Sequence, residues 1–157
     1  MKHLLIVFFL SASPTYGSDR NAVYSALKGS SIELLNEAVD SLLKTDTSSI
    51  NNGYLGALYM KRSLFIHSVK QKMDSFKMGK ELLETEITKS PNNVEFRFLR
   101  LIIQENAPPI VKYNKNIKED GEFIYNNFGK IDKALQDEII RFSAHSLHLE
   151  KELLIAD

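Results

Sequence analysis

The sequence predicts an all-α protein: one domain of about seven helices, paired as antiparallel hairpins and joined by short turns. Three observations support this fold class. Apolar residues recur at three- and four-residue steps along most of the chain, turn-forming residues separate the periodic segments, and no run alternates as a strand would. The 157 residues, 43% hydrophobic and 25% charged, supply enough apolar material for one core.

The first two helices of the domain are expected within residues 18–29 and 30–46. Gly29 ends the first of them. The second carries an apolar stripe at helical spacing, made of Ile32, Leu35, Val39 and Leu42. Ser30 and Glu33 have the spacing of a capping box, which predicts where this helix begins.

Two longer helices are expected within residues 51–68 and 70–90. The first is apolar around most of its circumference, which predicts burial between neighbouring helices. Its Gly56 and Ala57 would allow another helix to approach closely. The second includes Gly79 within an apolar stripe of Met73, Phe76, Leu83 and Ile87.

Three further helices complete the predicted domain. Asn92 or Asn93 caps the first of them, and a proline pair stops it. The second lies within residues 113–128, and the last extends over residues 130–154. The apolar stripe of the last helix is made of Leu135, Ile139, Phe142, Leu149 and Leu153.

The first 17 residues have the pattern of a secretory signal peptide. Lys2 supplies the positive charge, and Leu4–Leu10 is an apolar run too short to cross a bilayer as a permanent anchor. Cleavage is expected after Gly17, which leaves residues 18–157 as the mature domain. We therefore expect the protein to be secreted. The periplasm is the expected compartment and the cell exterior is the alternative, and no membrane anchor is expected after cleavage.

Composition narrows the classes of partner. Lysine plus arginine equals aspartate plus glutamate, at 20 each, so no basic stripe predicts a nucleic-acid partner. Cysteine is absent, which excludes disulfides and the attachment of lipid to an N-terminal cysteine. No cofactor is expected.

Two arginines lie inside one of the most apolar segments, "EFRFLRLIIQ". Helical spacing places Arg97, Arg100 and Gln104 on one face of the segment. In one interpretation the guanidinium groups pair with acids of a neighbouring helix, for which Glu119 and Asp120 are the candidates. In the other, they face an open groove and bind a carboxylate or phosphate.

The segment "FKMGKELLETEI" followed by "KSPNN" resembles the second helix and closing proline of a tetratricopeptide repeat. In that comparison Gly79 takes the place of the small residue, Leu83 of the large apolar residue and Pro91 of the proline. The longer pattern from Gly53 to Asp120 is similar to small secreted helical proteins of Bacteroidota that have no assigned activity. The resemblance implies a right-handed, tetratricopeptide-like stack of helical hairpins, although only one copy of the repeat is visible.

Such stacks usually bind other proteins. The expected function is therefore a secreted adaptor or scaffold that binds a protein or peptide and is not an enzyme. The candidate contact residues lie on the arginine face and on the loop that follows it: Tyr54, Arg97, Arg100, Gln104, Asn106, Tyr113, Asn114 and Asp120. The alternative is a protein or enzyme that uses Arg97 and Arg100 to bind a small anion. A third possibility is a structural subunit that completes its core by oligomerising.

No catalytic motif is present. Glu81, Glu84 and Glu86 are expected on an exposed helix face, so no carboxylate pair suggests glycoside hydrolysis. His145, His148 and Glu152 would share one side of the last predicted helix and form a weak metal-site candidate, but their spacing matches no known zinc signature. No metal is therefore expected.

Overall fold

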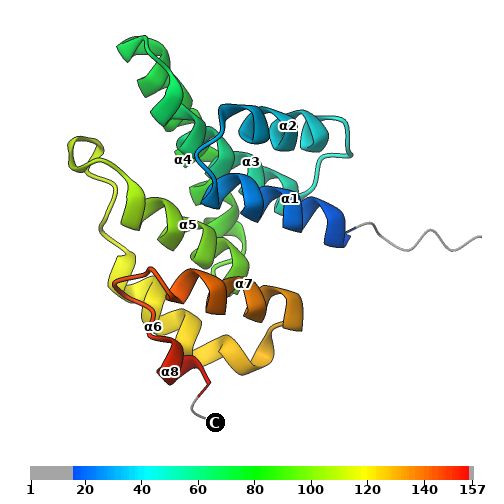
Figure 1. Ribbon diagram of the computed structural model, residues 1–157, viewed down its shortest axis with the longest axis vertical. Helices are drawn as coiled ribbons and strands as arrows, with labels where there is room; N and C mark the ends of the chain where they lie inside the picture. Colours follow the sequence, from blue (N-terminus) through cyan, green and yellow to red (C-terminus); the bar gives the residue numbers. More distant parts are fainter. Residues whose placement is uncertain (1–15, 156–157) are drawn as a thin grey trace, which may run out of the picture.

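The computed structural model describes the backbone of residues 16–155 and, from residue 19 onward, their side chains (Figure 1). Over this range the chain forms helices and no strands, which confirms the all-α class. The α-helices of the described residues are α1 Tyr16–Lys28, α2 Ile32–Leu43, α3 Ser49–Arg62, α4 Val69–Lys89, α5 Val94–Asn106, α6 Ile117–Asn127, α7 Lys133–Ser143 and α8 Lys151–Leu154. Three short 3-10 helices lie at Ser63–Phe65, Pro109–Val111 and Phe128–Lys130.

Helices that follow one another along the chain pack side by side. α1 lies against α2, α3 against α4 and α5 against α6, while α3 also contacts α1 and α5. The contact between α3 and α4 is the most extensive. The chain therefore runs through the molecule from α1–α4 at one end to α6–α8 at the other (Figure 1).

Polar side chains begin most of these helices by accepting hydrogen bonds from backbone N–H groups of the first turn. The N-cap residues that do so are Ser31, Ser48, Ser68, Asn93 and Asp132. The capping box predicted for α2 is wrong by one residue. Ser31, and not Ser30, accepts from the N–H of Leu34, and its hydroxyl donates to the side chain of Glu33. Because Glu33 follows Ser31 by only two positions, the two residues do not cap each other reciprocally.

α3 and α4 approach closely at two facing glycines, as expected for Gly56. A Cβ atom on Gly56 would lie 2.8 Å from the carbonyl oxygen of Gly79, and one on Gly79 would lie 2.5 Å from the carbonyl oxygen of Gly56. These neighbours are backbone atoms, which do not move aside as a side chain does. The extensive contact between the two helices therefore requires glycine at both positions.

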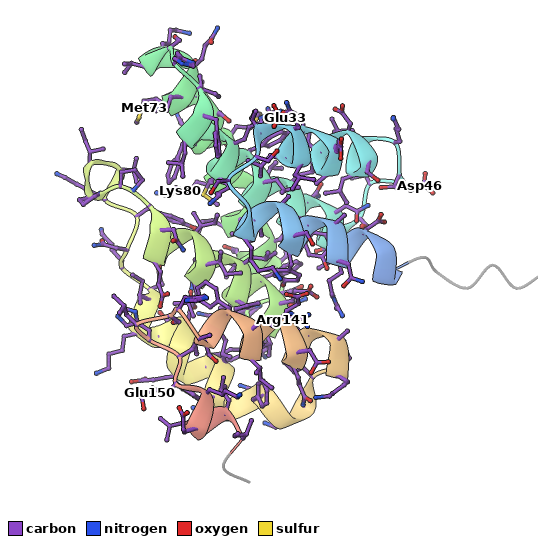
Figure 2. The ribbon with its side chains drawn as sticks, viewed as in Figure 1. Glu33, Asp46, Met73, Lys80, Arg141 and Glu150 are labelled. Atoms are coloured by element: carbon purple, nitrogen blue, oxygen red, sulfur yellow. The ribbon has the colours of Figure 1, made fainter. Side chains whose placement is uncertain are left out.

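One apolar cluster extends through the molecule. Its largest fully buried side chains are Tyr24, Leu35, Tyr54, Leu58, Met60, Leu83, Phe96, Phe98, Leu99, Leu101, Ile124 and Ile139. Most come from α3 and α5, and the burial predicted for the helix within residues 51–68 is confirmed for α3. Burial of each such aliphatic or aromatic side chain contributes roughly 1.5–3 kcal/mol. Met73 was expected in this core, but it is 49% exposed because it lies on the part of α4 that extends beyond its neighbours (Figure 2).

The single long helix predicted for the C-terminal region is wrong, because the chain leaves α-helical geometry at residues 144–150. The hydroxyl of Ser146 accepts hydrogen bonds from two backbone N–H groups that follow it and donates to Glu105 of α5. This local side-chain turn replaces the helical ladder. The change of direction also shifts the apolar stripe, so that Leu154 is buried and Leu153 is 59% exposed.

The expected signal peptide, residues 1–17, lies outside the described residues except for its last two, which begin α1. Among the helices of residues 16–155, none combines the length and the apolar character needed to cross a membrane.

Candidate functional site

Arg100 is the centre of a polar network that joins α4, α5 and α6. It binds Asp120 through two parallel hydrogen bonds, 2.6 Å from Nε to Oδ2 and 2.7 Å from Nη2 to Oδ1. Its Nη1 donates to Glu84 of α4 at 3.0 Å. Arg100 is 4% exposed and Asp120 is fully buried. Bidentate geometry of this kind is among the strongest arrangements available to a guanidinium group, and it fixes the relative orientation of the three helices.

Arg97 extends the network toward the surface. Its Nη1 lies 2.7 Å from Glu119 and 3.0 Å from Asp120, and its guanidinium carbon lies 5.0 Å from the centre of the Phe123 ring. The hydrogen bonds from Arg97 and then from Asn116 lower the pKa of the Glu119 carboxyl, so Glu119 stays ionised opposite the arginine. The expected pairing of the arginines with Glu119 and Asp120 is therefore present.

The network also positions the loop between α5 and α6, residues 107–116. The hydroxyl of Tyr113 donates to Glu84 at 2.6 Å, and the backbone N–H of Asn116 donates to Gln104 at 3.2 Å. Burial, followed by the hydrogen bond to Glu84, raises the pKa of Tyr113, so the tyrosine remains a neutral donor. A loop held by part-buried hydrogen bonds of this kind has few alternative conformations.

A hollow of about 290 Å³ lies between this loop and the segment that follows α7. Four of the predicted contact residues line it together: Gln104, Asn106, Tyr113 and Asn114. Its apolar lining includes Ile117 and Phe142. Two aliphatic side chains lie almost fully exposed on the segments that border it, with Ile110 84% and Leu147 88% exposed. We define this hollow, with Ile110 and Leu147, as the loop site.

The histidines at the loop site do not form the weak metal-site candidate with Glu152. His145 and His148 line the hollow, but Glu152 lies in α8, because the predicted common helix is broken between them. Nδ1 of His148 lies 2.8 Å from Oε1 of Glu105, so a carboxylate of α5 is its partner. Within the part of the chain that the structure describes, no group of three metal-ligating side chains comes together.

Tyr54 does not belong to the arginine face, and its predicted place there is wrong. It is buried, and its hydroxyl donates to Glu95 at 2.6 Å. Arg20 of α1 binds the same carboxylate in a bidentate manner, at 2.9 and 2.7 Å, and reaches Asp132 at the start of α7 at 2.8 Å. Tyr54 therefore belongs to a second network, between α1, α3 and α5, and not to the arginine face.

Sequence reasoning missed two acidic side chains that form hydrogen bonds between helices, Glu84 and Glu86. Glu84 was expected on an exposed face, but its carboxylate binds Arg100 and Tyr113. Glu86, expected on the same face, is 2% exposed and accepts hydrogen bonds from Ser49, Asn52 and Lys89. Only Glu81 is exposed as expected. A signal for Glu86 was available, since it shares the stripe of buried Leu83 at a three-residue step.

The comparisons with known proteins found no relative. No protein-family profile, curated protein or solved structure matches this chain.

Proposed function

We propose that the protein is a non-catalytic binding module, an adaptor or scaffold, that binds a segment of another protein at the loop site. The observation that carries the proposal is the way the loop is held. Most of residues 107–116 lie at the surface, yet the buried Tyr113 binds the half-buried Glu84 of α4, and Asn116 binds the buried Gln104 of α5. Hydrogen bonds beneath an exposed loop stabilise one loop conformation. A surface that is already ordered loses less conformational entropy when it binds a partner.

The lining of the loop site suits a polypeptide better than a small anion. Asn106 and Asn114 are exposed, and their amide groups can both donate to and accept from a peptide backbone. Leu147 lines the hollow and Ile110 follows its lining residue Pro109, so both offer exposed apolar surface to an apolar side chain of a partner. Apolar contacts combined with hydrogen-bonding groups are the usual composition of a specific protein interface.

The alternative of an anion site at Arg97 and Arg100 receives less support. Arg100 is buried and binds Asp120 and Glu84, while Arg97 binds Glu119 and Asp120. A ligand carboxylate would have to displace carboxylates that are already held at hydrogen-bond distance. We therefore assign the arginine face to positioning the loop site.

The proposal includes the finer architecture and the compartment. We propose that the helix pairs α1–α2, α3–α4 and α5–α6 form a tetratricopeptide-like, right-handed stack, with α1, α3 and α5 in successive contact. We further propose export through the signal peptide 1–17 to the periplasm or the cell exterior. N-terminal sequencing of the protein recovered from its own cells tests the cleavage after Gly17.

Site-resolved crosslinking tests the binding proposal. A photoreactive amino acid placed at Ile110 or Asn114 is expected to form one defined protein adduct in the cells that make the protein. The same group at Asp46, on the opposite side of the molecule, provides the control (Figure 2). Leu147→Asp in the same chain should abolish the adduct from Asn114. No adduct at the loop site, or the same adducts from Asp46, would refute the proposal.

A further inference from the structure

A second cavity, separate in its main walls from the loop site, lies where α1, α3, α5 and α7 meet. It measures about 500 Å³, which is within the range of about 300–1,000 Å³ that small-molecule sites occupy. Its walls are predominantly apolar and are formed by Tyr24, Leu27, Phe98, Ile102, Ile103 and Phe142. Only Asn106, Phe142 and His145 also line the loop site. We call this cavity the inner pocket.

The charged groups around the inner pocket are not balanced. Lys28, Lys61 and Arg141 line it together with a single carboxylate, that of Glu138. Glu138 is shared between Lys28 at 3.3 Å and Arg141 at 2.6 Å. The pocket therefore has two more formal positive charges than negative ones among these groups. Such a surplus beside apolar walls favours a negatively charged ligand.

Lys61, in the last turn of α3, is the cation without a carboxylate. It makes no ion pair with any acid of residues 19–155, whereas Lys28 and Arg141 both do. The residue is half-buried, and burial lowers the pKa of its ammonium group. A lysine beside an apolar surface normally extends its charge fully into water or pairs it. An anion in the pocket would restore the solvation that Lys61 has partly lost.

We propose that the inner pocket binds a small apolar carboxylate, with the ligand's carboxylate on Lys61 and its hydrocarbon part against Ile102, Ile103 and Phe142. A medium-chain fatty acid matches this pocket, because its carboxylate suits Lys61 and its hydrocarbon chain suits the apolar walls. Transfer of the hydrocarbon chain from water to the apolar walls supplies most of the affinity. The ion pair supplies the preference for an acid over a neutral molecule of the same length. This inference does not rest on the proposed function: three residues line both cavities, but Lys61, which would hold the ligand's charge, lines only the inner pocket.

Calorimetric titration of the purified protein with decanoate and with decan-1-ol tests the proposal. The two probes share a ten-carbon chain and differ in charge. Decanoate is expected to bind one to one and at least about tenfold more tightly than decan-1-ol. In methyl NMR spectra, decanoate should shift the signals of Leu27, Ile102 and Ile103 and leave those of Leu83, which does not line the pocket.

Substitutions at Lys61 assign the effect to that residue. Lys61→Met keeps the apolar stem and should weaken decanoate binding about tenfold or more, with the affinity for decan-1-ol changed less than about twofold. Lys61→Arg should retain most of the decanoate affinity. The matched control Lys77→Met removes an exposed lysine of α4 and should change neither affinity. Absence of decanoate binding, equal affinities for the two probes, or an unchanged affinity in Lys61→Met would overturn the proposal. If Lys61→Met fails to fold, the comparison of the two probes on the unaltered protein still decides.

Discussion

Replacing Arg100 by methionine separates a structural role of the arginine from a ligand-binding role. Methionine fills much of the volume of the arginine stem but removes both hydrogen bonds to Asp120 and the one to Glu84. Asp120 is fully buried and keeps only its 3.0 Å contact with Arg97. Removal of one partner of a buried ion pair costs about 3–5 kcal/mol, because the remaining charge stays desolvated. We expect a loss of about 3 kcal/mol, since Arg97 still compensates part of the charge of Asp120.

Urea unfolding followed by circular dichroism measures this loss. In thermal unfolding of a protein of this length, the same loss of about 3 kcal/mol should lower the melting temperature by about 6–12 °C. The control is Lys70→Met, because Lys70 pairs with Asp74 at 3.1 Å while the two side chains are 87% and 64% exposed. An exposed pair contributes about 0–1 kcal/mol, so the control should unfold almost as the unaltered protein does.

The double variant Arg100→Met/Asp120→Leu adds an internal test. If Asp120 is destabilising only when it is left without Arg100, removing both groups should cost less than the sum of the two single substitutions. The reasoning would be refuted if Arg100→Met lost less than about 1 kcal/mol and at the same time abolished binding of acetate or phosphate. Arg100 would then be a ligand-binding residue and not part of the scaffold.

Three further predictions test the packing, the loop and the acid dependence. Gly79→Ala should destabilise the protein by about 1–3 kcal/mol in urea unfolding, since its methyl group would overlap the backbone of α3, whereas Gly129→Ala should be neutral, because no atom lies within 4 Å of its Cβ position. Tyr113→Phe should cost about 1 kcal/mol and raise amide hydrogen exchange in residues 107–116, because the loop loses its hydrogen bond to Glu84, which keeps only Arg100 as a donor. Burial alone would raise the pKa of Glu86, but three side-chain hydrogen bonds lower it overall from its ordinary value of 4.5. The ionised Glu86 therefore stabilises the folded protein above pH 4.5, and this stabilisation is lost as the pH falls through the lower pKa that Glu86 has in the folded protein. Glu86→Gln should therefore flatten the dependence of unfolding free energy on pH below about pH 5, and an unchanged slope would contradict this assignment.

Helix positions were largely predictable from the sequence, because they depend on signals a few residues apart. The periodic stripe of α2, the stop at the proline pair and the cap at Asn93 depend on local geometry. The break at residues 144–150, where a continuous helix was predicted, also has a local cause. There a side-chain hydrogen-bonded turn competes with the helix that the apolar periodicity favours. Ser146 satisfies backbone N–H groups through its hydroxyl, and its bond to Glu105 favours this turn over a continued helix.

The site was predictable only in part, because its geometry depends on contacts between distant segments. The arginine partners Glu119 and Asp120 could be named, since they are acids on the next helix. Glu84 lies on the preceding helix, where charge patterning gives no sign that it turns inward. The convergence of the loop with the segment after α7 depends on the break in the last predicted helix, which periodicity did not reveal.

The two buried arginine networks specify how the helices are arranged more than they stabilise the fold. α5 supplies the acid to one network, through Glu95, and the base to the other, through Arg100. A rotation of α5 that exchanged its two sides would bring Glu95 toward Asp120 and Arg100 toward Arg20, so both pairs would be replaced by like charges. Well-packed apolar residues at these positions would give similar stability but would not oppose that exchange. Since the loop between α5 and α6 is tied to the Arg100 network, the same charges that fix the orientation of α5 also fix the position of the loop site.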